Sequence, residues 1–331
     1  MQVAVLGGGA IGSLVAARLH QAGVDVRLIG RQAQVDAIRA KGLLVKSPGA
    51  SLLVGLPATT TLEGTADAIL LTVKSQDVRD ACREIAALAS DATVVTMQNG
   101  VRSDGEAADI LGRERIVGCV LNISATYLEA GVVEQNTSGL FQVGAPFRES
   151  APGVAAVVDL LNQAIRTEPV PDIARARWTK LMANLNNAIM TITGLPIGKA
   201  LRHKGLARLS IATIREGVRT AQLGGFGLDQ SRRARTFRLM ATLPLPLSYR
   251  FFGGRLAGNF PPDSTYGPST LQSFQRGSSS ELDYLNGEIV TLGERIGRPT
   301  PYNKGLLETG RAVFATRDHL TPDDLIKKFR F

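Results

Sequence analysis

The glycines near the start of the chain have the spacing of a phosphate-binding turn. The apolar residues 3–6 are followed directly by Gly-Gly-Gly-Ala-Ile-Gly at residues 7–12. In a G-x-G-x-x-G turn, Gly7 bends the chain, Gly9 leaves room for a pyrophosphate, and Gly12 lets the next helix pack closely. The first N–H groups of that helix, at Ala10 and Ile11, would face the anion. We therefore predict a dinucleotide site formed by these five residues.

The residues after the second predicted strand, at 25–29, indicate which dinucleotide is bound. An NAD site usually has a carboxylate at this point, which accepts a hydrogen bond from the ribose 2′-hydroxyl. This chain has Gly30 and Arg31 instead. A guanidinium offers a planar set of donors that fits a 2′-phosphate. We predict NADP(H) with Arg31 as a ligand; the alternative is that Arg31 is an ordinary solvated arginine.

Lys180 and Asn184 are the polar residues of the second half best suited to acid–base chemistry. They lie four residues apart in a predicted helix, so they share one of its faces. The neighbouring Leu181 and Met182 indicate a buried helix, in which a desolvated lysine can act as a general acid. The alternative is a solvated helix face that carries no chemistry.

The segment around Glu281 allows two interpretations. Ser278 and Glu281 have the spacing of a helix capping box. Alternatively, the Glu281 carboxylate hydrogen-bonds a substrate hydroxyl. Asp283 and Asn286 are predicted to be helix-surface or packing residues. The three histidines form no cluster and the two cysteines lack metal-ligand spacing, so we predict no metal site.

A parallel sheet and a set of helices must position these residues. Up to about residue 145, strands alternate with helices, and the apolar run at 68–74 is typical of a strand buried on both faces. Further strands are predicted at residues 93–97 and 116–124, and helices at 13–22 and 77–88. Residues 132–135 and 140–143 are predicted to pair as a late antiparallel hairpin.

Beyond residue 152 the apolar spacing is mostly helical. Helices are predicted over residues 153–166, 174–192, 206–223, 230–241, 268–276, 279–296 and 303–316, whereas the Pro- and Gly-rich residues 243–265 are predicted to form a loop or irregular insertion. We therefore predict an α/β fold with a Rossmann-type dinucleotide-binding domain over residues 1–170. An all-helical substrate and catalytic domain follows over residues 171–331, with the binding site in the cleft between the domains.

The composition of the chain is that of a globular protein. Of its 331 residues, 44% are hydrophobic and 20% are charged. No apolar run reaches the 18 or so residues of a membrane span, and the N-terminus enters a strand at once. We therefore expect a cytoplasmic location and no membrane partner. Cys82 and Cys119 lie in apolar surroundings and are predicted to be buried free thiols.

The net charge of +9 is concentrated in the second half. The first 170 residues contain 14 Lys and Arg against 17 Asp and Glu, so the basic excess lies beyond them. Its densest part includes Arg232, Arg233, Arg235 and Arg238. Neither a nucleic-acid-binding motif nor an aromatic platform accompanies these arginines. We expect a solvated basic face, or attraction for an anionic ligand, rather than a nucleic-acid partner.

The combined motifs resemble the 2-dehydropantoate 2-reductase (ketopantoate reductase) family. They are Gly7-x-Gly9-x-x-Gly12, Arg31, Thr72-Val73-Lys74, Gln98-Asn99-Gly100, Trp178-x-Lys180-x-x-x-Asn184, and Ser269 with residues 281–287. They occur in the family's order over nearly the whole chain. The resemblance implies NADPH-dependent reduction of 2-dehydropantoate to pantoate, in pantothenate and coenzyme A biosynthesis. A homodimer is compatible with the sequence, which does not define the oligomeric state.

The resemblance also implies roles for individual residues. Lys180 would be the catalytic acid that protonates the alkoxide, and Glu281 would orient the lysine site or a hydroxyl and adjoin the cofactor. Asn184 and Ser269 would bind substrate. Lys74 and Asn99 would lie near the nicotinamide and its ribose, with Asn99 also reaching the substrate.

One departure from the family puts the substrate in question. Many family members carry an asparagine eight residues after the lysine, followed by proline, where this chain has Ala188 and Ile189. The alternatives are a related enzyme that acts on a different 2-oxo or 2-hydroxy acid, and a non-catalytic NADP-binding sensor.

Overall fold

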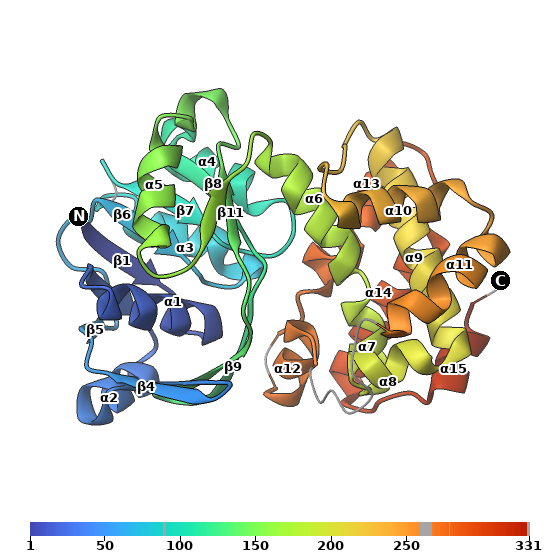
Figure 1. Cartoon of the computed structure of the whole chain (residues 1–331), viewed down its shortest axis with the longest axis horizontal. Helices are drawn as coiled ribbons and strands as arrows, with labels where there is room; N and C mark the ends of the chain where they lie inside the picture. Colours follow the sequence, from blue (N-terminus) through green and yellow to red (C-terminus); the bar gives the residue numbers. More distant parts are fainter. Residues whose placement is uncertain (89–90, 259–266, 278, 330–331) are drawn as a thin grey trace. The chain divides into compact units, whose positions relative to one another are not determined.

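The chain divides into two compact units, Met1–Ala176 and Arg177–Phe331. The computed structural model describes residues 1–88, 91–258, 267–277 and 279–329. The first unit is α/β and the second is helical, which confirms the predicted fold class (Figure 1). No helix in these described ranges is long and apolar enough to cross a membrane.

The first unit is built on an eight-stranded sheet. Its strand order is β12-β11-β8-β7-β6-β1-β2-β5. The strands are β1 (Gln2–Leu6), β2 (Asp25–Ile29), β5 (Ala58–Thr59), β6 (Ala68–Leu71), β7 (Thr93–Thr96), β8 (Ile116–Leu121), β11 (Phe141–Gly144) and β12 (Thr167–Pro169). All neighbours are parallel except β8 and β11. The order reverses between β1 and β6, which is where open α/β sheets bind ligands.

Alternate residues of each central strand enter two different cores. In β1, Val3 and Val5 pack on one face with helices α1 (Ala10–Gln21), α2 (Gln32–Lys41) and α5 (Gly153–Asn162). Ala4 and Leu6 pack on the other face with α3 (Val78–Ile85) and α4 (Ser103–Leu111). Helices on both faces explain why the strands read as continuous apolar runs. Cys82 and Cys119 are buried free thiols in these cores, as predicted.

A second sheet of four strands was not predicted, and it corrects the expected hairpin. Its order is β4-β3-β10-β9, with β3 (Leu43–Ser47), β4 (Ala50–Val54), β9 (Ser124–Glu129) and β10 (Val132–Thr137). β10 pairs with β9 and β3, whereas β11 pairs with β8 in the large sheet. The predicted pairing of 132–135 with 140–143 is therefore wrong. Apolar alternation identifies a strand, but its pairing partner depends on tertiary packing.

The second unit is formed by helices. They are α7 (Asn187–Thr193), α8 (Ile197–Arg202), α9 (Lys204–Leu223), α10 (Arg232–Thr242), α11 (Leu245–Gly258), α12 (Ser269–Gln275), α13 (Asn286–Arg295), α14 (Pro301–Thr316) and α15 (Pro322–Lys327). α6 (Ile173–Asn184) runs across the division between the units. Three short 3₁₀ turns, η1 (Ser75–Asp77), η2 (Arg113–Arg115) and η3 (Arg148–Ser150), lie in the first unit, and η4 (Leu282–Tyr284) lies in the second.

The segment predicted as a loop contains a helix. α11 covers most of residues 243–258, and the remainder of the predicted loop, residues 259–265, lies outside the described residues. Pro246 falls in the first helical turn, where its missing N–H removes no helical hydrogen bond. Ser248 is fully buried and accepts a 2.8 Å hydrogen bond from Arg215 Nη1. Tertiary contacts thus stabilise a helix that its proline and glycine content disfavours.

Candidate active site

The glycine turn has the close packing that its spacing predicts. Gly7 has φ of +122°, and a Cβ on it would lie 2.6 Å from Val73 N. A Cβ on Gly12 would overlap the carbonyl oxygen of Gly7 and the hydroxyl of Thr72. A Cβ on Gly9 would meet no described atom within 4 Å. Gly7 and Gly12 are therefore required by the close packing of the turn. Gly9 instead borders open space at the N-terminus of α1.

The N-terminus of α1 is suited to an anion. Gly9 is the N-cap residue and has no side chain that could satisfy the first N–H groups of the helix. The first turn, which begins with Ala10 and Ile11, contains no acidic residue. Free N–H groups and the positive end of the helix dipole favour a phosphate at this point. This region of the described chain therefore fits a dinucleotide pyrophosphate.

Gln34, which the sequence analysis did not identify, holds the turn in place. Its Nε2 donates to Ser13 Oγ at 3.0 Å, and Ser13 in turn donates to the carbonyl of Gly8 at 3.2 Å. Its Oε1 accepts hydrogen bonds from Tyr127 Oη at 2.9 Å and from Gly131 N at 2.8 Å. The buried amide therefore connects the glycine turn to the second sheet. A single glutamine shortly after the second predicted strand gives no sequence signal of such a role.

The loops after β6 and β7 meet the glycine turn at the carboxyl edge of the sheet. Thr72 Oγ1 donates to the carbonyl of Gly7 at 2.8 Å. Gln98 Nε2 donates to the carbonyl of Val73 at 3.1 Å, and Ser75 Oγ donates to the carbonyl of Asn99 at 3.0 Å. These bonds fix the segments that carry Lys74 and Asn99, both of which are half-buried.

Arg31 lies at the same edge, after β2. It is exposed and is the N-cap residue of α2, whose first turn contains no acidic residue. No hydrogen bond or ion pair engages its guanidinium within the described parts of the chain. Gly30 approaches Gly8 closely, since a Cβ on Gly8 would lie 3.1 Å from the Gly30 Cα. The structure therefore brings Arg31 and the glycine turn to neighbouring strand ends.

In the second unit, Lys180 and Asn184 lie on the less buried side of α6. Both are half-buried, whereas Leu181 and Met182 are buried. Trp178 stacks on Phe226 with ring centroids 4.6 Å apart, which anchors the opposite side of the helix. The four-residue spacing does place Lys180 and Asn184 on one face.

The predicted single helix over residues 174–192 is instead two helices, α6 and α7. Leu185 and Asn186 form a turn between them. Ile189 N bonds to the carbonyl of Asn186 at 3.0 Å, and the carbonyl of Leu185 accepts from Asn286 Nδ2 at 3.1 Å. A tertiary hydrogen bond has thus replaced the intrahelical one, immediately after Asn184.

Glu281 and Ser269 lie on separate segments of the second unit. Glu281 is 8% exposed and directly precedes η4, so the helix predicted over 279–296 begins only at Asn286. Ser269 is the first residue of α12, and its side chain lies outside the described residues. Ser278, the proposed partner in a capping box, is also outside them. The roles given to Lys180, Asn184, Ser269 and Glu281 therefore stay predictions.

A buried chain of amides anchors the Glu281 segment near the end of α6. Asn286 is fully buried and donates to Leu185 O and to Asn303 Oδ1, the latter at 3.0 Å. Asn303 Nδ2 then donates to Glu216 Oε1 at 2.9 Å. The prediction of Asn286 as a surface or packing residue missed this function. Its position next to the Leu185 turn appears only in the folded chain.

Glu216 should make the stability of the protein depend on pH. Burial raises the pKa of Glu216 above its ordinary 4.5, while hydrogen bonds from Asn303 and Tyr302 oppose that shift. A carboxyl with a raised folded-state pKa stabilises the fold fully below the unfolded-state pKa, and this contribution is lost as pH rises through the folded-state pKa.

We therefore expect the free energy of unfolding to fall as pH rises from about 4.5 through the raised pKa of Glu216. Glu216→Gln should flatten this slope, because the amide does not titrate in that window. Urea unfolding of both proteins over a pH series measures the difference. Identical slopes would show that Glu216 does not cause the pH dependence.

Two features define the class of protein. A dinucleotide-type glycine turn lies at the point where the strand order reverses, and a half-buried lysine lies on a helix of the second unit. Sites of the first kind bind dinucleotides, and lysines of the second kind can transfer protons. Within the described residues, no group of three His, Cys, Asp or Glu side chains could hold a metal ion. This combination is typical of a nicotinamide-dependent oxidoreductase.

Comparison with known proteins establishes the family. Residues 3–146 match the family described as "Ketopantoate reductase PanE/ApbA", and residues 172–313 match its C-terminal domain. The chain belongs to the ketopantoate reductase PanE/ApbA family, as the sequence motifs indicated. It is therefore an oxidoreductase of a family that uses a nicotinamide cofactor.

Individual relatives cover most of the chain. The 2-dehydropantoate 2-reductase of Pyrococcus horikoshii is 28% identical over 92% of this chain and 94% of its own length. That of Archaeoglobus fulgidus is 29% identical over 94% of this chain and 97% of its own.

Solved structures agree in fold. A PanE/ApbA family ketopantoate reductase from Ralstonia eutropha JMP134 is 28% identical, with a TM-score of 0.81 over 96% of this chain and 100% of its own. D-mandelate dehydrogenase with NADH and anilino(oxo)acetate has a TM-score of 0.83 at 22% identity, over 96% and 99%. The latter similarity concerns the fold alone.

Proposed function

We propose that this protein reduces 2-dehydropantoate to pantoate with NADPH. The observation that carries the proposal is the match of both units to one reductase family, together with a glycine turn that fits a pyrophosphate. When bound, the nicotinamide cofactor supplies the hydride that is added to the 2-oxo carbon.

Side chains of this chain transfer the proton and bind the substrate and cofactor. The Lys180 ammonium donates a hydrogen bond to the 2-oxo oxygen and then gives its proton to the alkoxide. Its positive charge also stabilises the negative charge that develops on that oxygen. Asn184 and Ser269 bind the substrate, with Asn99 as a further contact, and Glu281 orients the lysine or a substrate hydroxyl. Lys74 and Asn99 contact the cofactor.

A second substrate class has a specific observation in its favour. Ala188 is fully buried in α7, at the position where many family members carry asparagine. Losing an amide near the substrate-binding helix would weaken recognition of a substrate hydroxyl and favour a more apolar 2-oxo acid. D-mandelate dehydrogenase, which has the same fold, is named for a different 2-hydroxy acid.

A panel of 2-oxo acids tests the proposal. NADPH oxidation should be substrate-dependent and should have its highest kcat/KM with 2-dehydropantoate. A higher kcat/KM with benzoylformate or a branched aliphatic 2-oxo acid would replace the proposed substrate. No turnover with any member, despite tight NADPH binding, would instead favour a non-catalytic NADP-binding protein.

Arg31→Ala should reduce the preference for NADPH over NADH. The exposed guanidinium lies beside the N-terminus of α2, and together they would bind a 2′-phosphate that NADH lacks. A charge-assisted hydrogen bond contributes about 1.5–3 kcal/mol, so Kd for NADPH should rise about tenfold or more. Kd for NADH should change little.

Fluorescence titration of both cofactors measures these constants, and Arg27→Ala, on the preceding strand, is the matched control. Equal effects of Arg31→Ala on both cofactors would contradict a 2′-phosphate contact. A wild-type preference for NADH would contradict the assignment of NADP(H).

A further inference from the structure

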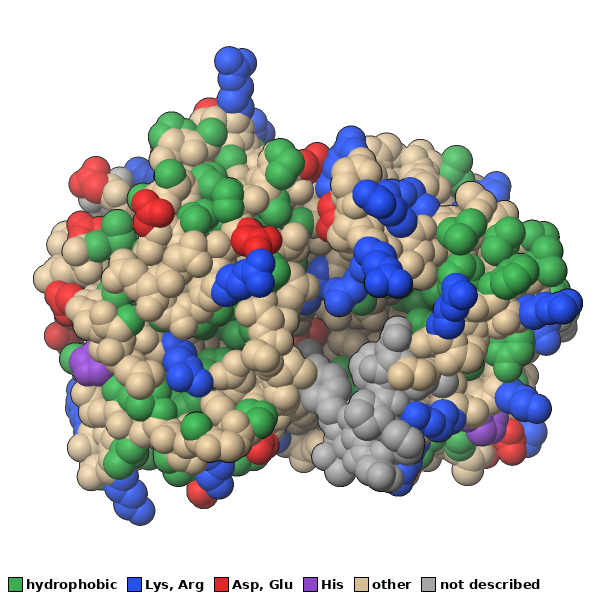
Figure 2. Space-filling model, viewed as in Figure 1, with side chains coloured by type: hydrophobic (Ala, Val, Ile, Leu, Met, Phe, Trp, Pro, Cys, Tyr) green, Lys and Arg blue, Asp and Glu red, His purple; other side chains and the backbone are tan. Residues whose placement is uncertain are grey.

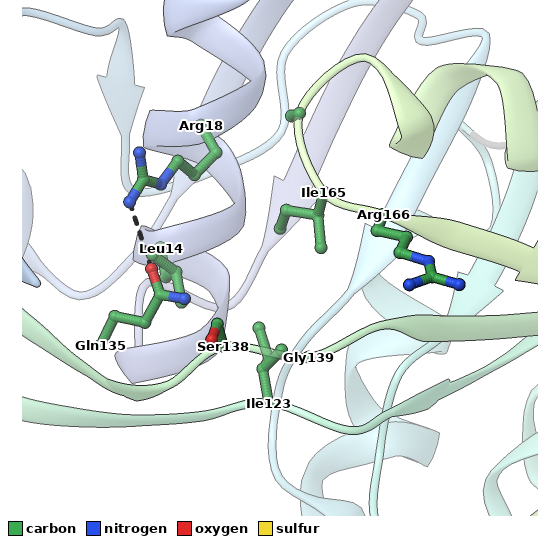
Figure 3. A pocket seen from close by; sticks show the side chains of 9 residues that line it. Leu14, Arg18, Ile123, Gln135, Ser138, Gly139, Ile165 and Arg166 are labelled. Atoms are coloured by element: carbon green, nitrogen blue, oxygen red, sulfur yellow. Dashed lines mark hydrogen bonds between the residues drawn. The ribbon is translucent and has the colours of Figure 1, made fainter.

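The first unit contains a cavity that the proposed reaction does not use. Its volume is about 240 Å³, and Figure 3 shows it between α1 and the connection from α5 to β12. Leu14 and Arg18 line it from α1, Ala164 and Ile165 from the connection, and Ile123 and Ser138 from the loops that flank β9 and β10. The volume is below the roughly 300 Å³ of the smallest drug-sized pockets, so only a small molecule would fit.

Arg18 lines this cavity and forms no ion pair with a carboxylate of the described residues. Its Nη2 donates to Ser47 Oγ and to Gln135 Oε1, both at 3.2 Å and both neutral acceptors. Within the described residues, Nε and Nη1 have no acceptor and no carboxylate forms an ion pair with the guanidinium. Arg18 is half-buried. A guanidinium held in place with donors to spare is suited to a carboxylate.

Arg166, the other arginine that lines the cavity, differs from Arg18 in its ion pairing and in its exposure. It already forms an ion pair with Glu168 at 2.5 Å, and its side chain is 73% exposed. Figure 3 shows it extending away from Arg18. The two arginines therefore do not form one diffuse basic surface, and the anion-binding position is at Arg18.

The aliphatic walls of the cavity favour a ligand with a non-polar body. Leu14, Ile123, Ala164 and Ile165 present aliphatic surface to the cavity. In Figure 3, Ile165 and Ile123 lie on the side of the cavity opposite Arg18. A ligand with one carboxylate and a short aliphatic body would satisfy both kinds of wall, whereas inorganic phosphate would satisfy only the guanidinium.

The cavity is separate from the glycine turn on the same helix. Arg18 follows Gly9 by nine residues, so it lies about 13 Å further along the axis of α1. A ligand at Arg18 would therefore not compete with a pyrophosphate at the N-terminus of the helix.

We propose that this cavity is an accessory binding site for a small aliphatic carboxylate, with Arg18 as the residue that binds the carboxylate. The site is independent of the reductase activity proposed above. Its test therefore measures binding alone.

Isobutyrate is a suitable probe, titrated against the whole protein by NMR at constant ionic strength. Isobutyramide has the same shape without the charge, and acetate and phosphate carry charge without the branched body. Isobutyrate should bind saturably and the other three much more weakly. Arg18→Gln should raise its Kd about tenfold or more, the loss expected for a charge-assisted hydrogen bond.

Two further variants complete the experiment. Ala164→Leu should fill the cavity and raise the Kd comparably without changing any charge, while Arg166→Gln should leave it within about twofold, as expected for an exposed ion pair. Thermal unfolding verifies that each variant is folded. Isobutyrate binding that survives both Arg18→Gln and Ala164→Leu but is lost in Lys180→Ala would overturn the proposal. Equal binding of phosphate and isobutyrate would also overturn it, as would the absence of saturable isobutyrate binding.

Discussion

Lys180→Ala should lower kcat by about 10²- to 10⁴-fold, the range that a positioned general acid contributes. In the proposed mechanism, alanine removes both the proton donor and the positive charge that stabilises the alkoxide. The glycine turn proposed to bind the cofactor belongs to another unit of the chain, so Kd for NADPH should stay near its wild-type value. Stopped-flow hydride transfer and cofactor titration measure the two effects separately.

Lys199→Ala is the matched control, because Lys199 is an exposed lysine on α8 of the same unit and the variant should have wild-type turnover. Near-normal turnover of Lys180→Ala would remove Lys180 from the mechanism.

The second large effect is expected from Gly12→Ala. The added Cβ would overlap the carbonyl of Gly7 and the hydroxyl of Thr72, which are held by the close approach of α1 to the ends of β1 and β6. Overpacking of this kind costs about 1–3 kcal/mol or more. We expect a lower midpoint of urea unfolding together with loss of NADPH binding, because the turn must shift to admit the methyl group.

Gly9→Ala is the informative partner of that variant. A Cβ on Gly9 would meet no described atom within 4 Å, so the unfolding midpoint should change little. The same methyl group would occupy the space through which a pyrophosphate approaches the N-terminus of α1, so Kd for NADPH should rise about tenfold or more. Wild-type NADPH affinity in Gly9→Ala would show that the pyrophosphate lies elsewhere.

The second unit carries many exposed basic side chains. On the face of this unit seen in Figure 2, Lys and Arg side chains are spread over several places rather than in one continuous stripe. Arg232, Arg233 and Arg235 are exposed on α10. A dispersed positive surface would attract anionic ligands such as NADPH and a 2-oxo acid over a long range.

Much of the first unit could be predicted because its signals are local. A strand, a glycine turn and a helix are contiguous in sequence, and parallel strands necessarily place their carboxyl ends at one edge. Gly7, Arg31, Lys74 and Asn99 therefore reach that edge whichever loops connect the strands. The second sheet joins two local hairpins, β3 with β4 and β9 with β10. It was missed because nothing in residues 132–137 specifies their pairing with residues 44–46, which lie far away in the sequence.

In the second unit, the sequence by itself determined that α6 carries Lys180 and Asn184 on one face, because that follows from helical periodicity alone. Only the tertiary structure decided where this helix ends. Asn286, about a hundred residues later, takes the carbonyl of Leu185 that a continuous helix would use, and Arg215 stabilises a helix in a segment rich in proline and glycine. Both depend on hydrogen bonds between residues distant in the chain, which helical propensity and periodicity do not describe.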